Sequence, residues 1–189
     1  MQLKDRLMIL VDTETTGFSK DKHQLLEVGI LVMQNREIKA EFEVQIKHKD
    51  YTVTTSAMSA NKIDLIKHEE TALTLNDAAE EILKFLKEHN NTGNGYIFVG
   101  QNVQFDIGFL EKMFLECRRI KEYRDLVSYR NFDLMHLALT KNLEGKIELE
   151  KLNLDTILTT LGIEIPENRH RALQDCYLEF EAINRLLDL

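Results

Sequence analysis

The sequence predicts an α/β protein in which helices pack on a mixed β-sheet. Three observations lead to this prediction. The apolar run at residues 7–11 is too short for a helix and has the composition of a buried strand. Two further strand patterns follow at residues 24–34 and 37–46, and helical patterns occupy much of the remaining chain. Antiparallel strands followed by helices are typical of a mixed sheet with helices on it.

The predicted first strand, residues 6–13, leads into two acidic side chains. Strand side chains alternate between faces, so Asp12 and Glu14 are expected to point the same way and Thr13 to point away. Two neighbouring carboxylates at the end of a buried strand repel each other and lose hydration, so either a cation compensates them or one pKa rises. A strand end that frays into solvent is the alternative, and these residues alone leave both interpretations open.

The next two predicted strands form a hairpin. Asn35 and Arg36 make a two-residue connection that lacks the favoured glycine. In the second strand, polar residues alternate with an apolar face made of Ile38, Ala40, Phe42, Val44 and Ile46. The stretch at 56–68 is expected to contain one or two short helices. Residues 75–89 have apolar side chains at helical spacing, with Thr74 or Asn76 as the candidate cap.

The second half of the chain alternates between strands and helices. Asp106 falls in the first turn of a predicted helix, directly after a short buried strand, where an acid also complements the helix N-terminus. Asp133 is the expected cap of a later helix. The predicted elements are strands at 96–100 and 128–132 and helices at 104–119, 134–140, 150–161 and 171–187.

Composition restricts the class of protein. The chain has 189 residues, 43% of them hydrophobic and 30% charged, which fits one globular domain spanning residues 1–189. No apolar span approaches the length of a transmembrane helix, so no membrane partner is expected. The two cysteines form no CxxC pair, which suits a reducing cytoplasmic location. The net charge of −8 argues against long-range attraction to a duplex and leaves open only a small, local, metal-centred contact with one strand end.

His170 and Asp175 complete a pattern of separated polar residues. On one continuous helix they would lie ~140° apart, at about 100° per residue, but a histidine at the loop–helix junction could reach the same site as Asp175. The order is Asp-x-Glu after the first strand, Asp after a later strand, and His-x4-Asp at the last helix. Residues 11–17, 100–110 and 170–175 together resemble the DEDDh group of 3′→5′ exonucleases, which includes the proofreading epsilon subunit of bacterial DNA polymerase III and RNase T.

The resemblance implies a fold and a reaction. The fold is ribonuclease H-like α/β, with a five-stranded mixed sheet and helices on both faces. The implied ligands of two Mg²⁺ or Mn²⁺ ions are Asp12, Glu14, Asp106 and Asp175. Carboxylate oxygens suit such hard cations, and two ions can assist in-line hydrolysis of a phosphodiester. His170 resembles the family's general base, a role for which a near-neutral imidazole is suited.

The implied substrate is the 3′ end of a single-stranded nucleic acid. By resemblance, Thr15, Thr16 and Gly17 line the pocket for the terminal nucleotide, and Phe18 stacks on a base or serves only the turn. Asn102 supports the substrate strand or caps the helix that carries Asp106. Gln101 replaces a histidine that many relatives carry, and Gln174 and Cys176 flank Asp175, but these departures replace no implied ligand or base.

Several functional alternatives remain at this point. The leading expectation is a 3′→5′ exonuclease that releases nucleoside 5′-monophosphates from DNA in proofreading or repair, either free-standing or as a partner of a DNA polymerase subunit. The alternatives within the same fold are an RNase T-like exoribonuclease and a non-catalytic nucleic-acid-binding or protein-binding module. A phosphatase with Asp12 as nucleophile is disfavoured, because Glu14 stands where that class has a second aspartate.

Overall fold

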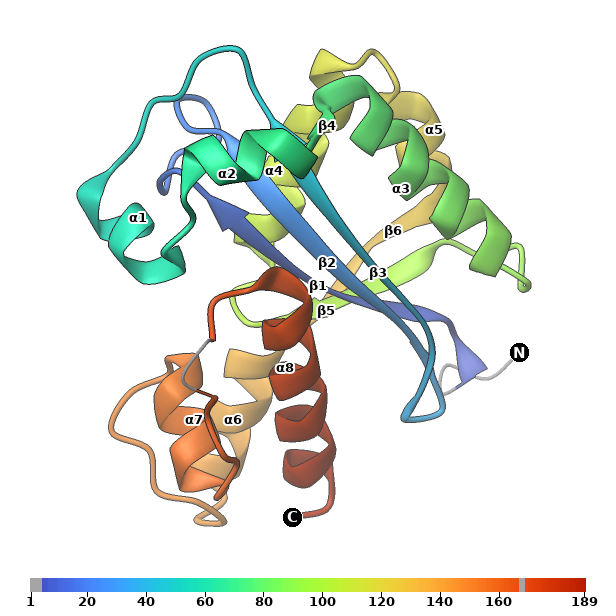
Figure 1. The fold of residues 1–189 in the computed structure, drawn as a ribbon. Helices are drawn as coiled ribbons and strands as arrows, with labels where there is room; N and C mark the ends of the chain where they lie inside the picture. Colours follow the sequence, from blue (N-terminus) through green and yellow to red (C-terminus); the bar gives the residue numbers. More distant parts are fainter. Residues whose placement is uncertain (1–4, 167–168) are drawn as a thin grey trace.

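A six-stranded mixed sheet forms the centre of the computed structural model, which describes residues 5–166 and 169–189 (Figure 1). The strand order is β4-β3-β2-β1-β5-β6. The bounds are β1 Met8–Thr15, β2 Leu25–Gln34, β3 Glu37–Lys47, β4 Leu73–Thr74, β5 Tyr96–Gly100 and β6 Val127–Asp133. The α/β fold is confirmed, but the expected count of five strands is wrong. The extra strand, β4, has only two residues and is too short to leave a sequence pattern.

The central strand β1 has neighbours of both directions. It pairs antiparallel with β2 and parallel with β5, so the carboxyl ends of β1 and β5 lie at the same edge of the sheet. β1 begins and ends two residues later than predicted. The predicted hairpin of β2 and β3 is present, and Asn35 and Arg36 both have positive φ, which is the backbone geometry of a tight hairpin turn without glycine.

Helices cover both faces of the sheet (Figure 1). α3, α4 and α5 pack on one face, and α6, α7 and α8 pack on the other. The short helices α1 and α2 connect β3 to β4. The bounds are α1 Thr55–Asn61, α2 Leu65–Thr71, α3 Leu75–His89, α4 Gln104–Glu116, α5 Ile120–Leu126, α6 Leu134–Leu143, α7 Leu154–Thr160 and α8 Ala172–Leu187.

The alternation of side chains along β1 divides the interior into two cores. Ile9 and Val11 face the core shared with α3, α4 and α5, and Leu10 faces the core shared with α6, α7 and α8. Two buried faces explain why this strand has a continuous apolar sequence. Within the described ranges, none of the helices has both the length and the apolar character required to cross a bilayer.

The helix predicted at 104–119 begins where expected but ends three residues earlier in the structure, and a further helix follows it. α4 ends at Glu116, and α5, which was not predicted, begins at Ile120. Arg118 adopts a left-handed conformation between them, with φ +57°. Because an arginine makes this break and not a glycine, the sequence contains no usual stop signal at that point.

Candidate active site

The carboxyl end of β1 presents the first two predicted acids. Asp12 lies opposite Gly29 on β2, and Glu14 lies opposite Glu27. Asp106 lies in the first turn of α4, which follows β5 at the same sheet edge. The Thr13 hydroxyl, which was expected to point away from Asp12 and Glu14, donates a 2.7 Å hydrogen bond to Oδ1 of Asp106. β1 and α4 are therefore joined at the point where their acids meet.

Gly29 determines how closely α8 approaches this edge. A Cβ at position 29 would lie 2.4 Å from the backbone carbon of Ala172 and the nitrogen of Leu173, so no side chain fits there. The first turn of α8 therefore lies directly on β2 beside Asp12, and Asp175 occupies that turn. Residues from β1, α4 and α8 thus reach one site although they are far apart in the sequence.

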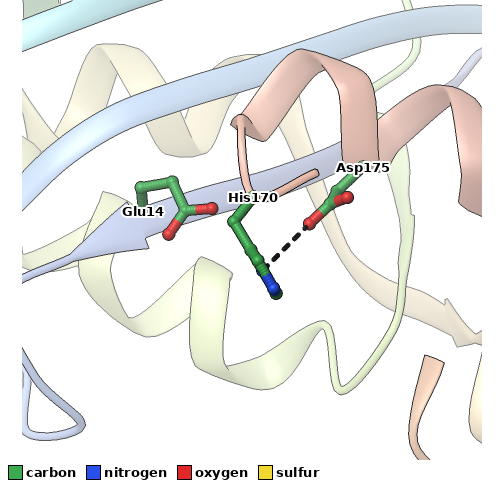
Figure 2. A group of neighbouring side chains, drawn as sticks. All are labelled: Glu14, His170 and Asp175. Carbon is green, nitrogen blue, oxygen red and sulfur yellow. Dashed lines mark ion pairs between the residues drawn. The ribbon is translucent and has the colours of Figure 1, made fainter. Parts of the chain in front are cut away.

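His170 lies just before α8, at the loop–helix junction that the sequence predicts, with φ +76°. Its Nδ1 is 3.9 Å from Oδ2 of Asp175. One ligand atom from each of Glu14, His170 and Asp175 lies within 4.8 Å of the others, and Figure 2 shows the three side chains grouped together. Arg169 also contacts Asp175, with Nε 3.3 Å from Oδ1, and forms a second ion pair with Asp155.

Burial raises the pKa of all four predicted acids, and repulsion by neighbouring acids adds to this effect at Asp12, Glu14 and Asp106. Burial, and then the negative charges of Asp106 and other nearby acids, raises the pKa of Asp12 well above its ordinary value. Burial, reinforced by the charge of Asp175, raises the pKa of Glu14 from 4.5 to about 8. Burial raises the pKa of Asp106 from 3.8 to about 7, and burial also raises the pKa of Asp175. Acids that raise one another's pKa form a site that attracts positive charge.

The pKa of the His170 imidazole shifts in the opposite direction from the pKa values of the acids. Burial, followed by the positive charge of Arg169, lowers the pKa of His170 below its ordinary 6.5, although Asp175 acts to raise it. The ring is therefore neutral near pH 7 and can accept a proton.

Glu179 is a fifth acid that the sequence analysis did not identify. Its side chain is 1% exposed, and one oxygen accepts a 3.1 Å hydrogen bond from the Gln101 backbone. Burial raises the pKa of Glu179 well above its ordinary value, and the charge of Asp106 adds to this effect. Its position four residues after Asp175, on the same face of α8, is the sequence signal that could have revealed it.

Asp133 and Asn102 shape the loop that leads into α4. Asp133 caps α6 as predicted, and it also accepts hydrogen bonds from the backbone N–H groups of Asn102 and Val103, both at 3.2 Å. Asn102 has φ +53°. The expected side-chain cap of α4 by Asn102 is wrong, because the N-cap position is Val103 and no side chain forms a cap hydrogen bond there.

The residues predicted to line the nucleotide pocket form the turn after β1. The hydroxyl of Thr15 donates to the Gly17 carbonyl at 2.9 Å, and the hydroxyl of the fully buried Thr16 donates to the Thr52 carbonyl at 2.7 Å. At Gly17 a Cβ would lie 2.6 Å from the ring of His23. Phe18, in contrast, is 72% exposed. The threonines therefore hold the turn in place, and Phe18 is the side chain that it presents to solvent.

Comparison with known proteins relates this geometry to a family. A family model described as "Exonuclease" matches residues 9–182. A DNA polymerase III of PolC type from Thermotoga maritima is 23% identical over 186 residues, which is 98% of this chain and 12% of that protein. The 3′-5′ exonuclease DinG of Staphylococcus haemolyticus is 30% identical over 108 residues, which is 57% of this chain and 11% of that protein.

Solved structures of E. coli exonuclease I have the same fold as this chain. The complex of E. coli exonuclease I with a dT13 oligonucleotide superposes with a TM-score of 0.79 and 16% sequence identity, covering 97% of this chain and 41% of that one. A zinc-bound complex of E. coli exonuclease I with single-stranded DNA gives a TM-score of 0.80 at 17% identity, covering 97% and 40%. The chain thus spans about an eighth of the PolC-type relative and about two fifths of exonuclease I.

Proposed function

Because this chain belongs to the exonuclease family, we propose that it is a 3′→5′ exonuclease that releases nucleoside 5′-monophosphates from single-stranded ends. The supporting observation is the group of acids from β1, α4 and α8 that raise one another's pKa beside the neutral His170. We assign the domain to residues 1–189.

The side chains fit a pair of hard divalent cations. Asp12, Glu14, Asp106 and Asp175 offer only carboxylate oxygens, which favour Mg²⁺ or Mn²⁺ over metals that prefer sulfur. Oδ1 of Asp175 is buried and accepts no hydrogen bond from the residues that the structure describes, although Nε of Arg169 lies 3.3 Å away, so a bound cation would compete with Arg169 for this atom. When bound, two such ions would activate a water molecule and stabilise the charge that develops on the phosphodiester.

The proposed role of His170 follows from its place and its protonation state. Its lowered pKa leaves a neutral ring nitrogen, and its position before α8 puts that nitrogen beside Asp175 and Glu14. In this proposal the imidazole removes a proton from the attacking water, and Asp175 orients the ring.

The turn after β1 is the proposed pocket for the terminal nucleotide. Thr15, Thr16 and Gly17 hold the turn through the hydrogen bonds and the close His23 contact described above. The exposed Phe18 is available to stack on a base, an interaction of about 1–3 kcal/mol that reads little sequence. Asn102 faces the same edge of the sheet from the loop before α4 and is proposed to support the strand.

The relatives favour DNA as the substrate. One is a DNA polymerase III, another is a 3′-5′ exonuclease, and E. coli exonuclease I has been solved with a DNA oligonucleotide. We therefore propose single-stranded DNA and a role in proofreading or repair, with a DNA polymerase subunit as a candidate partner. RNA end-trimming is the second candidate for the same site.

A labelled-strand time course tests the proposal. Matched single-stranded DNA and RNA, labelled at the 5′ end or the 3′ end, are incubated with Mg²⁺, Mn²⁺ or EDTA. We expect 5′-labelled DNA to shorten stepwise, 3′-labelled DNA to release mononucleotide at once, and EDTA to stop both reactions. Full folding by circular dichroism with no hydrolysis of any strand in either metal would instead identify a non-catalytic binding module.

A further inference from the structure

A cavity of about 440 Å³ separates α1 and α2 from the residues that precede α8. Four basic side chains line it against a single acid, Asp64, and His170 of the candidate active site also lines it. The basic residues are Lys62, Lys67, Arg169 and Arg171. A second cavity of about 250 Å³, between the turn after β1 and α4, has four lysines but three acids, and therefore provides a natural comparison. In a protein of net charge −8, a basic cavity beside the candidate active site requires an explanation.

The framework fixes this cavity relative to the acids. The backbone N–H of Thr54, the N-cap of α1, donates to the Thr16 carbonyl at 2.8 Å. At the other end of α1, the Asn61 side chain donates to the Thr15 carbonyl at 3.1 Å. Lys62, which ends α1, is therefore held beside the end of β1, and its positive charge contributes to the lowered pKa of His170.

Two of the four basic residues are already neutralised. Arg171 forms an ion pair with Glu27, and Arg169 forms ion pairs with Asp155 and Asp175. Lys67 has only a 3.9 Å contact with Asp64, in an exposed pair of little strength. Lys62 has no carboxylate within ion-pair distance among residues 5–166 and 169–189. Within the described ranges, the charge of Lys62 therefore has no acidic partner, and that of Lys67 is offset only by its weak contact with Asp64.

The backbone conformation at Lys62 also sets this residue apart from the two paired arginines. Its φ is +55°, a left-handed conformation that glycine adopts without strain and that a lysine adopts at some cost. Helix α1 would therefore end more favourably with glycine than with lysine at this position. The long side chain is present although the local backbone does not favour it.

We propose that Lys62 and Lys67 bind backbone phosphates of the substrate strand upstream of the terminal nucleotide. The inference rests on the proposed function, because it gives the strand a path away from the same site. A polyanion gains attraction from these lysines only when its end is already close, since the protein as a whole carries a net charge of −8.

The test separates strand binding from chemistry. The variants are Lys62→Gly, Lys67→Gln and the double variant, with Lys22→Gln and Lys49→Gln from the second cavity as matched exposed controls. Glycine removes the charge at position 62 and suits the positive φ, so the variant should fold. For a dT12 oligonucleotide we expect the KM of the double variant to rise about tenfold, with kcat within about twofold of wild type.

Two further measurements make the result specific. The slope of log(kcat/KM) against log[salt] should become shallower by about 1.4, since each single-strand phosphate contact contributes about 0.7. Hydrolysis of thymidine 5′-(4-nitrophenyl phosphate), which has no upstream phosphates, should remain unchanged. An unchanged KM and salt slope for dT12 in an active double variant would overturn the inference and leave the proposed function intact.

If the wild-type protein proves inactive, binding of dye-labelled dT12 in Ca²⁺ can still be measured by fluorescence anisotropy. If wild type cleaves neither substrate but binds dT12, and the double variant binds about tenfold more weakly, the inference holds and the proposed function fails. If wild type neither cleaves nor binds dT12, both fail.

Discussion

Glu14 and Glu27 face each other across β1 and β2, yet their surroundings differ. Glu27 is fully buried and holds the guanidinium of Arg171, whose Nε lies 3.1 and 3.0 Å from its two oxygens and whose Nη2 lies 2.5 Å from one of them. Glu14 forms no ion pair with any basic side chain in the described ranges 5–166 and 169–189. Burial and the charge of Asp175 raise its pKa to about 8, and the charge of Arg171 offsets this only in part.

We interpret Glu27 as an acid that stabilises the fold and Glu14 as an acid of the proposed metal site. The cation of Glu27 is part of the chain, and the ion pair connects β2 to the residue that precedes α8. The charge of Glu14 is left for a bound cation to neutralise. Two identical side chains in register therefore predict opposite responses to the same substitution.

Glu14→Gln should give the largest effect, and it should be an effect on activity. Loss of one carboxylate from the proposed metal site should lower kcat/KM by about 10³-fold or more, since each 1.36 kcal/mol of lost stabilisation is a factor of ten. The metal-free variant should unfold at the same temperature as wild type or higher, because the substitution relieves repulsion among Asp12, Glu14 and Asp175. Single-strand hydrolysis and thermal unfolding in EDTA measure the two effects, and retained hydrolysis would contradict the assignment.

His170→Ala should reduce turnover by about 10²–10⁴-fold while metal binding persists. In the proposal, the imidazole moves a proton and the carboxylates hold the ions. Isothermal titration with Mn²⁺ alongside kcat measurements separates these roles. A variant that loses Mn²⁺ affinity together with activity would show that His170 is a ligand, which its position within 4.8 Å of Glu14 and Asp175 would also permit.

Glu27→Gln should act on stability first. The substitution leaves Arg171 without its partner, but because the Arg171 side chain is 44% exposed, the cost should be smaller than the about 3–5 kcal/mol typical of a fully buried pair. Urea unfolding should show this loss equally with and without Mg²⁺, in contrast to Glu14→Gln. Stability equal to that of wild type would mean that the two glutamates do not differ in the way proposed.

The sequence revealed the acids whose pattern is local and missed those whose role depends on distant contacts. Strand alternation predicts that Asp12 and Glu14 share a face, and the five-residue spacing to Asp175 suggests a junction position for His170, but the proposed roles of these residues came from the resemblance to a family. Glu27 looked like an ordinary strand residue because its partner is 144 residues away. Glu179 was overlooked for the same reason, since its buried environment arises only when α8 packs on the sheet beside the loop at Gln101.

The helices and strands show the same difference between local patterns, which the sequence reveals, and packing effects, which it does not. The helix α3 was predicted with its observed bounds, because its apolar face has a regular period and Thr74 caps it. The end of α4 was predicted three residues too late because Arg118 adopts a positive φ without the glycine that usually marks a helix end. The strand β4 has too few residues for any period to be visible. Period and capping are local properties, whereas sheet edges and helix breaks depend on packing.

The smallest expected effect is a pH dependence of stability in the metal-free protein. The pKa of Glu14 rises on folding from 4.5 to about 8, and that of Asp106 rises from 3.8 to about 7, so the folded state binds more protons than the unfolded state across this range. Stability is therefore retained below about pH 4 with respect to these groups and is lost as the pH rises towards 8. We expect the free energy of unfolding in EDTA to fall as the pH rises from 5 to 8, because each of these groups holds a proton in the folded state that it has lost in the unfolded state.

The two facing glutamates provide the controls for that measurement. Glu14→Gln should flatten the pH dependence, because one of the groups with a raised pKa is gone. Glu27→Gln should lower the whole curve and reduce its slope less than Glu14→Gln does, because the charge of Glu27 is only one of the causes that raise the pKa of Glu14. Mg²⁺ should flatten the wild-type curve, because the ions favour the charged carboxylates. A slope that Mg²⁺ and Glu14→Gln both leave unchanged would place its origin outside the acids at the end of β1.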